Sequence, residues 1–318
     1  MIYMEIGGYF GLERMNGSEY HRGAIALNTA GNCLRYIIET RDIKKIYVPY
    51  FLCLSVTRAC KKSHCEVEYY NIDKCFLPDF EKKLGDGEYL YVVNFYGQLR
   101  NETLYELKNK HKNIIVDNAQ AFFDAPIDDT DTIYSCRKFF GVPDGAYLYT
   151  DSILNMDLEQ DISYHRMTHI LGRHELGANK FYKDYTLNEK DMGNQPIKTM
   201  SKLTHSLLGT INYTEAAEKR NKNYTFLHTN LTEINNLTLN IPYGPFMYPL
   251  HINDGMRLRE MLIEKNVFVP TLWKGVFEIA KKGTISWDYA ENIVALPCDH
   301  RYGINEMKYI IELIKGEM

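Results

Sequence analysis

The stretch IIVDNAQAFFDAPIDDTDTIYSCRKFFGVPDGAYLYT, residues 114–150, decides the fold of this chain. It opens with an apolar run, Ile114–Val116, that ends directly on the acid Asp117. A second apolar run, residues 132–134, leads into Lys138 and then into the turn formed by residues 143–145. Short runs that are almost entirely apolar are typical of strands in a parallel sheet that is covered on both faces. We therefore expect buried strands here, with the polar residues that follow them gathered at one edge of the sheet.

The same alternation extends outward over residues 25–150. Apolar or β-rich runs recur, and polar or helical stretches such as residues 100–112 separate them. The runs are residues 46–48, 67–70, 89–93, 114–116, 132–134 and 146–149. This order predicts an α/β protein whose large domain has a mostly parallel central sheet. Polar residues that follow the strand at 89–93, among them Asn94, Tyr96 and Gln98, either contact a substrate or order their own loop.

The remaining chain has a different organisation. Residues 155–200 are polar and irregular, and residues 201–235 show the helical periodicity of a long bridge. An α+β pattern follows and indicates a small C-terminal domain. We expect the large domain to span 1–230 and the small one 231–318. The predicted elements of the second domain are strands near 243–250, 267–269 and 293–296, and helices at 256–265 and 305–315.

Composition excludes several classes of protein. The net charge of −4 over 318 residues gives no electrostatic reason to expect a nucleic acid or a membrane surface as partner. No secretion signal or long apolar run is present, and seven cysteines read as reduced thiols, so we expect a cytoplasmic location. His165, His169 and His174 lack a suitably spaced acid, so no metal site is predicted.

The polar residues around the opening stretch suggest a cofactor. Aromatic neighbours of Lys138 disfavour its charged form and make the amine a nucleophile. A buried acid such as Asp117 needs a partner, and a protonated pyridine nitrogen is a suitable one. Residues Thr29, Ala30 and Gly31 open a predicted helix, whose backbone N–H groups and dipole can bind a phosphate. Together these groups predict pyridoxal 5'-phosphate.

Several motifs in this order are similar to those of the DegT/DnrJ/EryC1/StrS family. They include TAGNCLRYI at 29–37, IIVDNAQAF at 114–122, SCRKFFGVPDGA at 135–146 and MSKLTHSLLG at 200–209. The resemblance covers the chain from about residue 25 onward. It implies the type I fold of pyridoxal-phosphate-dependent transferases, with a large domain and a small C-terminal α+β domain. It also implies the activity of that family, which consists largely of sugar aminotransferases.

The resemblance assigns residues to the cofactor ring. Asp117 matches the acid that pairs with the pyridine nitrogen, and Gln120 matches the amide that binds the ring's phenolic oxygen. Ala119 would lie against one ring face, and Cys53 falls where the family places the residue on the other face. Alternatively, Asp117 and Gln120 could each have only a structural role and hydrogen-bond to nearby backbone groups.

The resemblance also assigns the covalent and phosphate-binding residues. Lys138 matches the Schiff-base lysine, and Ser135 matches the phosphate-binding serine, although the family places that serine five residues before the lysine and here it lies three before. The asparagine that normally reaches the phosphate of a neighbouring subunit is missing before Met200-Ser201, and Lys198 is a possible cationic replacement.

The implied activity is transfer of an amino group from an amino acid, with glutamate expected, to a nucleotide-linked keto sugar in a homodimer. Two alternatives remain open. Some relatives are sugar dehydratases, but these typically replace the lysine with histidine, and here Lys138 is present. The other alternative is a non-catalytic binding or regulatory protein, suggested by the missing asparagine and the short chain. A nicotinamide enzyme fits less well because no Gly-x-Gly-x-x-Gly follows the first strand.

Overall fold

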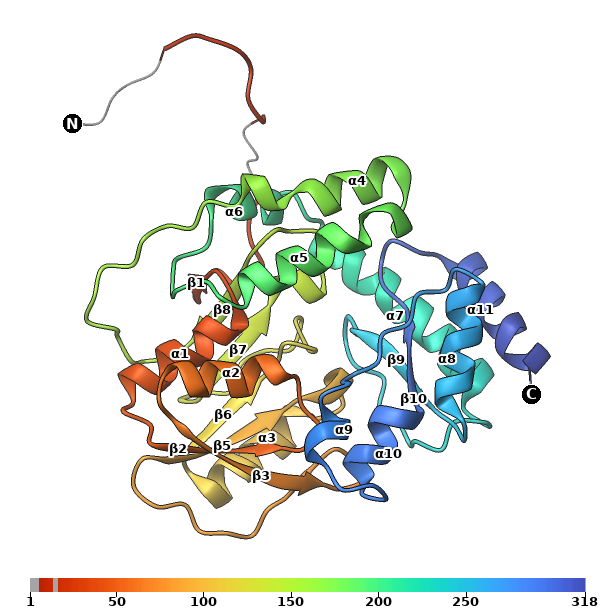
Figure 1. Cartoon of the computed structure of the whole chain (residues 1–318), viewed down its shortest axis with the longest axis horizontal. Coiled ribbons are helices and arrows are strands. Elements are labelled where there is room, and N and C mark those ends of the chain that lie inside the picture. Colours follow the sequence, from red (N-terminus) through yellow and green to blue (C-terminus); the bar gives the residue numbers. More distant parts are fainter. Residues whose placement is uncertain (1–5, 14–16, 318) are drawn as a thin grey trace.

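A twisted sheet forms the centre of the protein, as seen in the computed structural model, which describes residues 6–13 and 17–317 (Figure 1). Within the described residues this sheet has eight strands, in the order β1-β8-β7-β6-β5-β2-β3-β4. Their bounds are β1 Ile25–Leu27, β2 Lys45–Pro49, β3 Glu66–Ile72, β4 Pro78–Asp79, β5 Glu88–Val93, β6 Ile114–Asp117, β7 Asp131–Ser135 and β8 Ala146–Tyr149. Five neighbouring strands, β3, β2, β5, β6 and β7, run parallel, whereas β8 runs antiparallel to both β7 and β1. The predicted α/β class with a mostly parallel sheet is confirmed.

The middle strands are buried because both faces of the sheet are covered. Every residue of β6 and β7 is buried, which is why β6 is apolar up to Asp117 and β7 has an apolar centre, Ile133 and Tyr134. In the register between them, Asp117 lies opposite Ile133. The polar residues that follow each strand therefore begin at the same edge of the sheet.

Three helices connect the parallel strands: α1 (Ala30–Thr40), α2 (Leu54–Lys62) and α3 (Asn101–His111). Helix α1 begins at its N-cap Thr29, whose hydroxyl accepts a hydrogen bond from Asn32 N–H at 3.0 Å. Its apolar face, with Cys33, Leu34 and Ile37, is buried in the main core and packs against α2. This local capping and periodicity explain why the start of α1 was predictable.

The segment 155–200, predicted to be irregular, contains two helices, α4 (Thr168–Leu176) and α5 (Tyr182–Met192). That part of the prediction was wrong. None of the residues of α4 is buried, and in α5 only Asn188 and Met192 are, so no apolar stripe marks either helix in the sequence. The helical bridge predicted for 201–235 is likewise two helices, α6 (Lys202–Leu208) and α7 (Tyr213–Leu231), because Asn212 starts the second by capping Glu215 N–H.

The C-terminal part has its own sheet and core. Strands β9 (Met247–His251) and β10 (Ile293–Pro297) pair antiparallel, and helices α8 (Gly255–Glu264), α9 (Val276–Ile279), α10 (Ile285–Asn292) and α11 (Ile304–Glu317) accompany them. A second hydrophobic core joins β9, β10, α8 and α11 to the end of α7 (Figure 1). A small C-terminal α+β unit is thus present, whereas the exact boundary after residue 230 stays a prediction.

The strand predicted at 267–269 is absent, since the structure has an irregular segment there. Val267 N–H donates to Leu262 O at 2.8 Å and so closes the end of α8. Val267 and Val269 still bury their side chains in the second core, while Pro270 cannot donate to a ladder. Among the residues that the structure describes, no helix is both long and apolar enough to cross a membrane.

Candidate active site at the strand ends

The carboxylate of Asp117 is held at the end of β6. Its Oδ2 accepts a hydrogen bond from Tyr91 OH at 2.9 Å, and its Oδ1 accepts one from Ala119 N–H at 2.8 Å. Burial, together with the nearby Asp117 charge, raises the pKa of Tyr91 well above its ordinary value, so the phenol remains a donor. Two fixed donors therefore orient a carboxylate that is only 8 % exposed.

Gln120 is fixed on one side and free on the other. Its Oε1 accepts a hydrogen bond from Tyr96 N–H at 2.8 Å, and this bond identifies the amide oxygen. Its Nε2 is buried and has no hydrogen-bond partner among the described residues. Buried donors are nearly always paired, so an unpaired one close to Asp117 in sequence fits an acceptor that the protein itself does not supply.

The predicted phosphate cradle lies at the start of α1. Thr29 caps the helix, and residues Thr29, Ala30 and Gly31 are all partly exposed. The first turn contains no acidic residue that would oppose an anion. A Cβ added at Gly31 would meet Ser55 O, the Thr29 hydroxyl and Ala59 only at ordinary contact distances of 3.9–4.0 Å. The start of α1 is therefore open and has no acidic residue in its first turn, and its role as a phosphate site stays a prediction.

Lys138 ends a 3-10 turn, Cys136–Lys138, that follows β7 directly. Its side chain is exposed and has no hydrogen bond or ion pair to another described residue, and its Nζ lies 5.8 Å from the Phe246 ring centroid. The expected shielding of the amine by apolar groups is thus limited within one chain. Ser135, the last residue of β7, is buried and its side chain does not cap the turn.

The turn at residues 143–145 has a structural role. The fully buried Asp144 accepts hydrogen bonds from Ser201 N–H at 2.9 Å, from the Ser201 hydroxyl at 2.7 Å and from the Thr204 hydroxyl. Gly145 has φ +115, and a Cβ there would lie 3.0 Å from a Thr204 methyl carbon. The turn therefore attaches β8 to the start of α6, next to the strand that leads to Lys138.

The structure locates Cys53 and Ala119, the two residues predicted to lie against the ring faces, but does not test their contact with a ring. Cys53 is the N-cap residue of α2, half-buried, and its sulfur accepts a hydrogen bond from the Ser55 hydroxyl at 3.1 Å. Ala119 is 4 % exposed and lies in the turn after Asp117. Their positions against a ring remain predictions.

Two of the polar residues after β5, Asn94 and Gln98, form hydrogen bonds within the chain, whereas the buried hydroxyl of Tyr96 has no partner among the described residues. Asn94 Oδ1 accepts from Leu99 N–H at 2.9 Å, and its Nδ2 donates to Asp124 at 3.1 Å. Gln98 Oε1 accepts from Asn240 N–H at 2.8 Å. For Asn94 and Gln98 these bonds favour a structural role over contact with a substrate.

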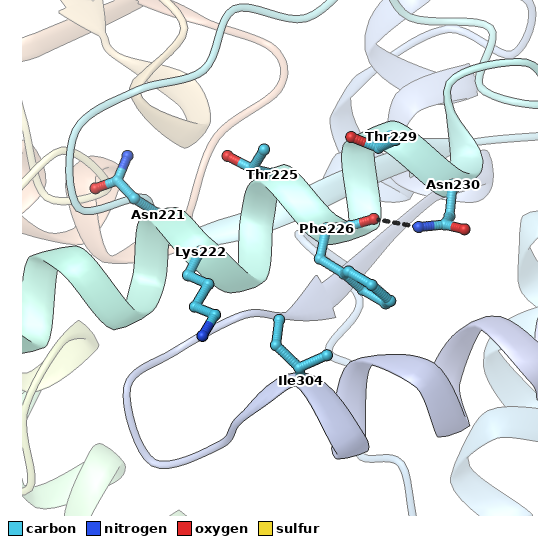
Figure 2. A pocket seen from close by; sticks show the side chains of 7 residues that line it. All are labelled: Asn221, Lys222, Thr225, Phe226, Thr229, Asn230 and Ile304. Carbon is cyan, nitrogen blue, oxygen red and sulfur yellow. Dashed lines mark hydrogen bonds between the residues drawn. The ribbon is translucent and has the colours of Figure 1, made fainter.

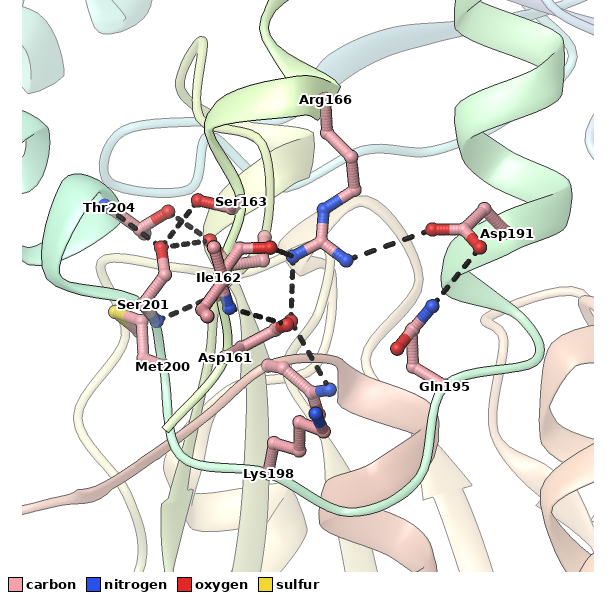
Figure 3. Close-up of polar contacts among 12 residues, drawn as sticks. Asp161, Ile162, Ser163, Arg166, Asp191, Gln195, Lys198, Met200, Ser201 and Thr204 are labelled. Carbon is pink, nitrogen blue, oxygen red and sulfur yellow. Dashed lines mark hydrogen bonds and ion pairs between the residues drawn. The ribbon is translucent and has the colours of Figure 1, made fainter. Parts of the chain in front are cut away.

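Lys198 is paired within its own chain, because its Nζ lies 3.1 Å from the Glu159 carboxylate. A nearby buried ion pair, Arg166 with Asp161 at 2.7 Å, was not predicted at all (Figure 3). Arg166 is also 3.7 Å from the carboxylate of Asp191. Sequence reasoning had no signal for this cluster, because it lies in the segment without apolar periodicity.

A separate hollow of about 500 Å³ lies between α7 and the start of α11 (Figure 2). Its lining residues are Asn221, Lys222, Thr225, Phe226, Thr229, Asn230 and Ile304. None of the predicted site residues is among them, so this hollow does not compete with the strand-end site.

Solved structures with a similar fold are sugar and related aminotransferases. One from Brucella abortus, of the DegT DnrJ EryC1 StrS type, superposes with a TM-score of 0.62 at 12% identity and covers 92% of this chain and 85% of that one. The chain has the aminotransferase fold. NtdA from Bacillus subtilis, solved with bound cofactor PMP, gives 0.65 at 14% identity over 92% and 74% of the two chains. DesI, solved in the presence of its TDP-sugar product, gives 0.65 at 13% identity over 92% and 80%. No family model and no curated protein sequence matches the chain.

Proposed function

We propose that this protein is a pyridoxal-phosphate-dependent aminotransferase of the DegT/DnrJ/EryC1/StrS type. It would move an amino group from an amino acid, with glutamate as the expected donor, to a nucleotide-linked keto sugar. One observation carries the proposal: a buried, oriented carboxylate, an unpaired amide donor and a free lysine follow the ends of two adjacent parallel strands, β6 and β7. The fold similarity to solved sugar aminotransferases supports it.

The residues present fit the cofactor. Asp117 would hold the protonated ring nitrogen, and Gln120 Nε2, which lacks an acceptor, would donate to the ring hydroxyl. The backbone N–H groups of Ala30 and Gly31 at the start of α1, with the Ser135 hydroxyl, would bind the phosphate. When bound, the cofactor supplies an electron sink for the carbanion that forms at the amino acid's Cα.

Lys138 would have two roles. Its Nζ is exposed and has no hydrogen bond or ion pair within the described part of the chain, so it is available as the nucleophile that anchors the cofactor. Once it is not bound to the cofactor, the same Nζ would act first as general base and then as general acid, taking the proton from the donor's Cα and giving it to another carbon of the reacting molecule. The phosphate contacts and Gln120 would keep the reacting atoms within its reach.

A homodimer would complete the surroundings of Lys138. The amine is exposed in one chain. The resemblance to the DegT/DnrJ/EryC1/StrS family implies a site built between two subunits. The α4–α5 hairpin exposes large apolar side chains, including Leu171, Leu176 and Leu187, which suits a subunit contact. We also propose a cytoplasmic location, which the sequence analysis predicted.

The first experiment is reconstitution of the purified protein with pyridoxal 5'-phosphate, followed by Lys138→Ala and, as control, Lys308→Ala, another exposed lysine. We expect a yellow chromophore that borohydride fixes covalently in the parent and the control but not in Lys138→Ala. Incubation with glutamate and a panel of nucleotide keto sugars should then release 2-oxoglutarate. A parent protein that stays colourless with added cofactor would contradict the proposal.

That outcome would favour the second candidate, a non-catalytic binding or regulatory protein of the same fold. The observation behind this candidate is that the family's phosphate-binding asparagine is missing and that Lys198, its possible replacement, lies 3.1 Å from the Glu159 carboxylate. A sugar dehydratase is less well supported, because Lys138 is present where dehydratases typically have histidine.

A further inference from the structure

We infer that Asn28 is a positioning residue that holds the phosphate-binding turn, residues Thr29–Gly31, in its binding geometry. The inference rests on the proposed function and extends it. Asn28 would not touch the phosphate itself. It acts by fastening the start of α1 to the segment Gln195–Lys198, which lies far away in the sequence.

The evidence begins with Asn28, which is fully buried. All four of its hydrogen-bonding groups are used. Its backbone N–H donates to Lys198 O at 3.0 Å, and its backbone C=O accepts from Gly145 N–H at 2.7 Å. Its side-chain Nδ2 donates to Pro196 O at 3.1 Å, and its Oδ1 accepts from Asn32 Nδ2 at 2.8 Å. The residue before the phosphate-binding turn is thus fixed from every side.

Asn32 provides the matching contact one helical turn later. Its Nδ2 donates to Pro196 O at 2.7 Å, so the two asparagines bind the same carbonyl. Thr29, Ala30 and Gly31 lie between them in the chain, and Thr29 also accepts from Asn32 N–H. Both ends of the three-residue turn are therefore held against one carbonyl oxygen, which fixes the directions of its backbone N–H groups.

The segment that supplies this carbonyl is itself anchored. Gln195 donates to Asp191 at 3.1 Å, and Asp191 lies 3.7 Å from Arg166 (Figure 3). Arg166 forms the buried pair with Asp161, whose Oδ2 also lies 3.5 Å from Asn28 Nδ2. The Arg166 guanidinium compensates the negative charge of Asp161. Asp161 can therefore accept from Asn28 Nδ2 while it repels a nearby phosphate dianion only weakly.

In this arrangement different residues would bind the phosphate and the ring of the cofactor, so the two contacts can be tested separately. A change at Asn28 or Asn32 alters the phosphate-binding turn but leaves Asp117 and Gln120, which would bind the ring, untouched. The loss of binding affinity in these variants should therefore occur only for a ligand that carries the phosphate group. A general structural defect would weaken every ligand alike.

The test compares pyridoxal 5'-phosphate with pyridoxal, each titrated into apo protein and followed by absorbance. The variants are Asn28→Ala and Asn32→Ala. The second is included because alanine is the best helix former, so this variant is expected to fold even if Asn28→Ala does not. The control is Thr40→Ala, which removes a hydrogen bond to Tyr36 O, 2.9 Å long, at the other end of α1. We expect both variants to bind pyridoxal 5'-phosphate about tenfold more weakly, and pyridoxal within about twofold of the parent.

The outcomes are distinct. Equal weakening of both ligands, or no weakening of either, in the folded Asn32→Ala variant overturns the inference while the proposed function stands. A parent protein that binds both ligands equally well also overturns it, because no phosphate site would then exist at α1. If the parent forms no borohydride-reducible chromophore with either ligand, the proposed function itself fails. If Asn28→Ala does not fold, the Asn32→Ala result decides.

Discussion

Replacement of Asp144 by alanine should destabilise the whole protein. The carboxylate is completely buried and accepts three hydrogen bonds, two from Ser201 and one from Thr204. Hydrogen bonds to charged groups contribute about 1.5–3 kcal/mol each, but removing a buried charge also removes its desolvation cost. We therefore expect a net loss of about 3 kcal/mol. Asp144→Asn keeps an acceptor and loses one of the backbone or hydroxyl bonds, so it should cost about 1–2 kcal/mol.

The assay is urea unfolding of the two variants and of Asp157→Ala, an exposed acid that serves as control. The control should stay within about 0.5 kcal/mol of the parent. With an unfolding entropy of about 2.1 cal/mol/K per residue over 318 residues, a loss of 3 kcal/mol corresponds to a melting temperature lower by roughly 4–5 °C. If Asp144→Ala unfolds at the same urea concentration as Asp157→Ala, the buried network does not contribute as argued, and the attachment of β8 to α6 must depend on other contacts.

Two further outcomes follow from titratable groups. The hydrogen bond to Glu19 raises the pKa of His205 above 6.5. Burial alone would raise the pKa of Glu19, but the hydrogen bonds from His205 and Tyr147 outweigh it and lower that pKa below 4.5. The pair should thus contribute fully between pH 4.5 and 6.5 and fade as pH rises through the folded-state pKa of His205. The urea midpoint of His205→Ala should differ from the parent more at pH 5.5 than at pH 9; an equal difference would contradict this. Burial raises the pKa of the Cys33 and Cys136 thiols. Iodoacetamide at pH 8 should therefore label the exposed Cys75 first, which peptide mass spectrometry can measure. Equally fast labelling of Cys33 would refute the argument that burial protects this thiol.

Part of the fold and of the candidate site follows from the sequence alone. The apolar run that ends at Asp117, the cap at Thr29 and the helices α3 and α11 were all predictable. Each depends on residues within one or two turns of one another, where periodicity and capping are visible in the order of residues. The places of Asp117, Lys138 and the start of α1 along the chain, next to the ends of predicted strands and helices, follow from the same local signals.

Only the tertiary structure decided which polar groups are already occupied. The sequence alone left open whether Asn94 and Gln98 contact a substrate, and it left Lys198 as a possible phosphate ligand. The structure shows each of them bound to residues of its own chain. It also shows that Asn28 binds a carbonyl 168 residues further along the chain, and that α4 and α5 are helices with almost no buried face. A hydrogen bond across such a distance has no local pattern, and a helix that buries little shows no apolar stripe, so neither could be inferred before the chain was folded.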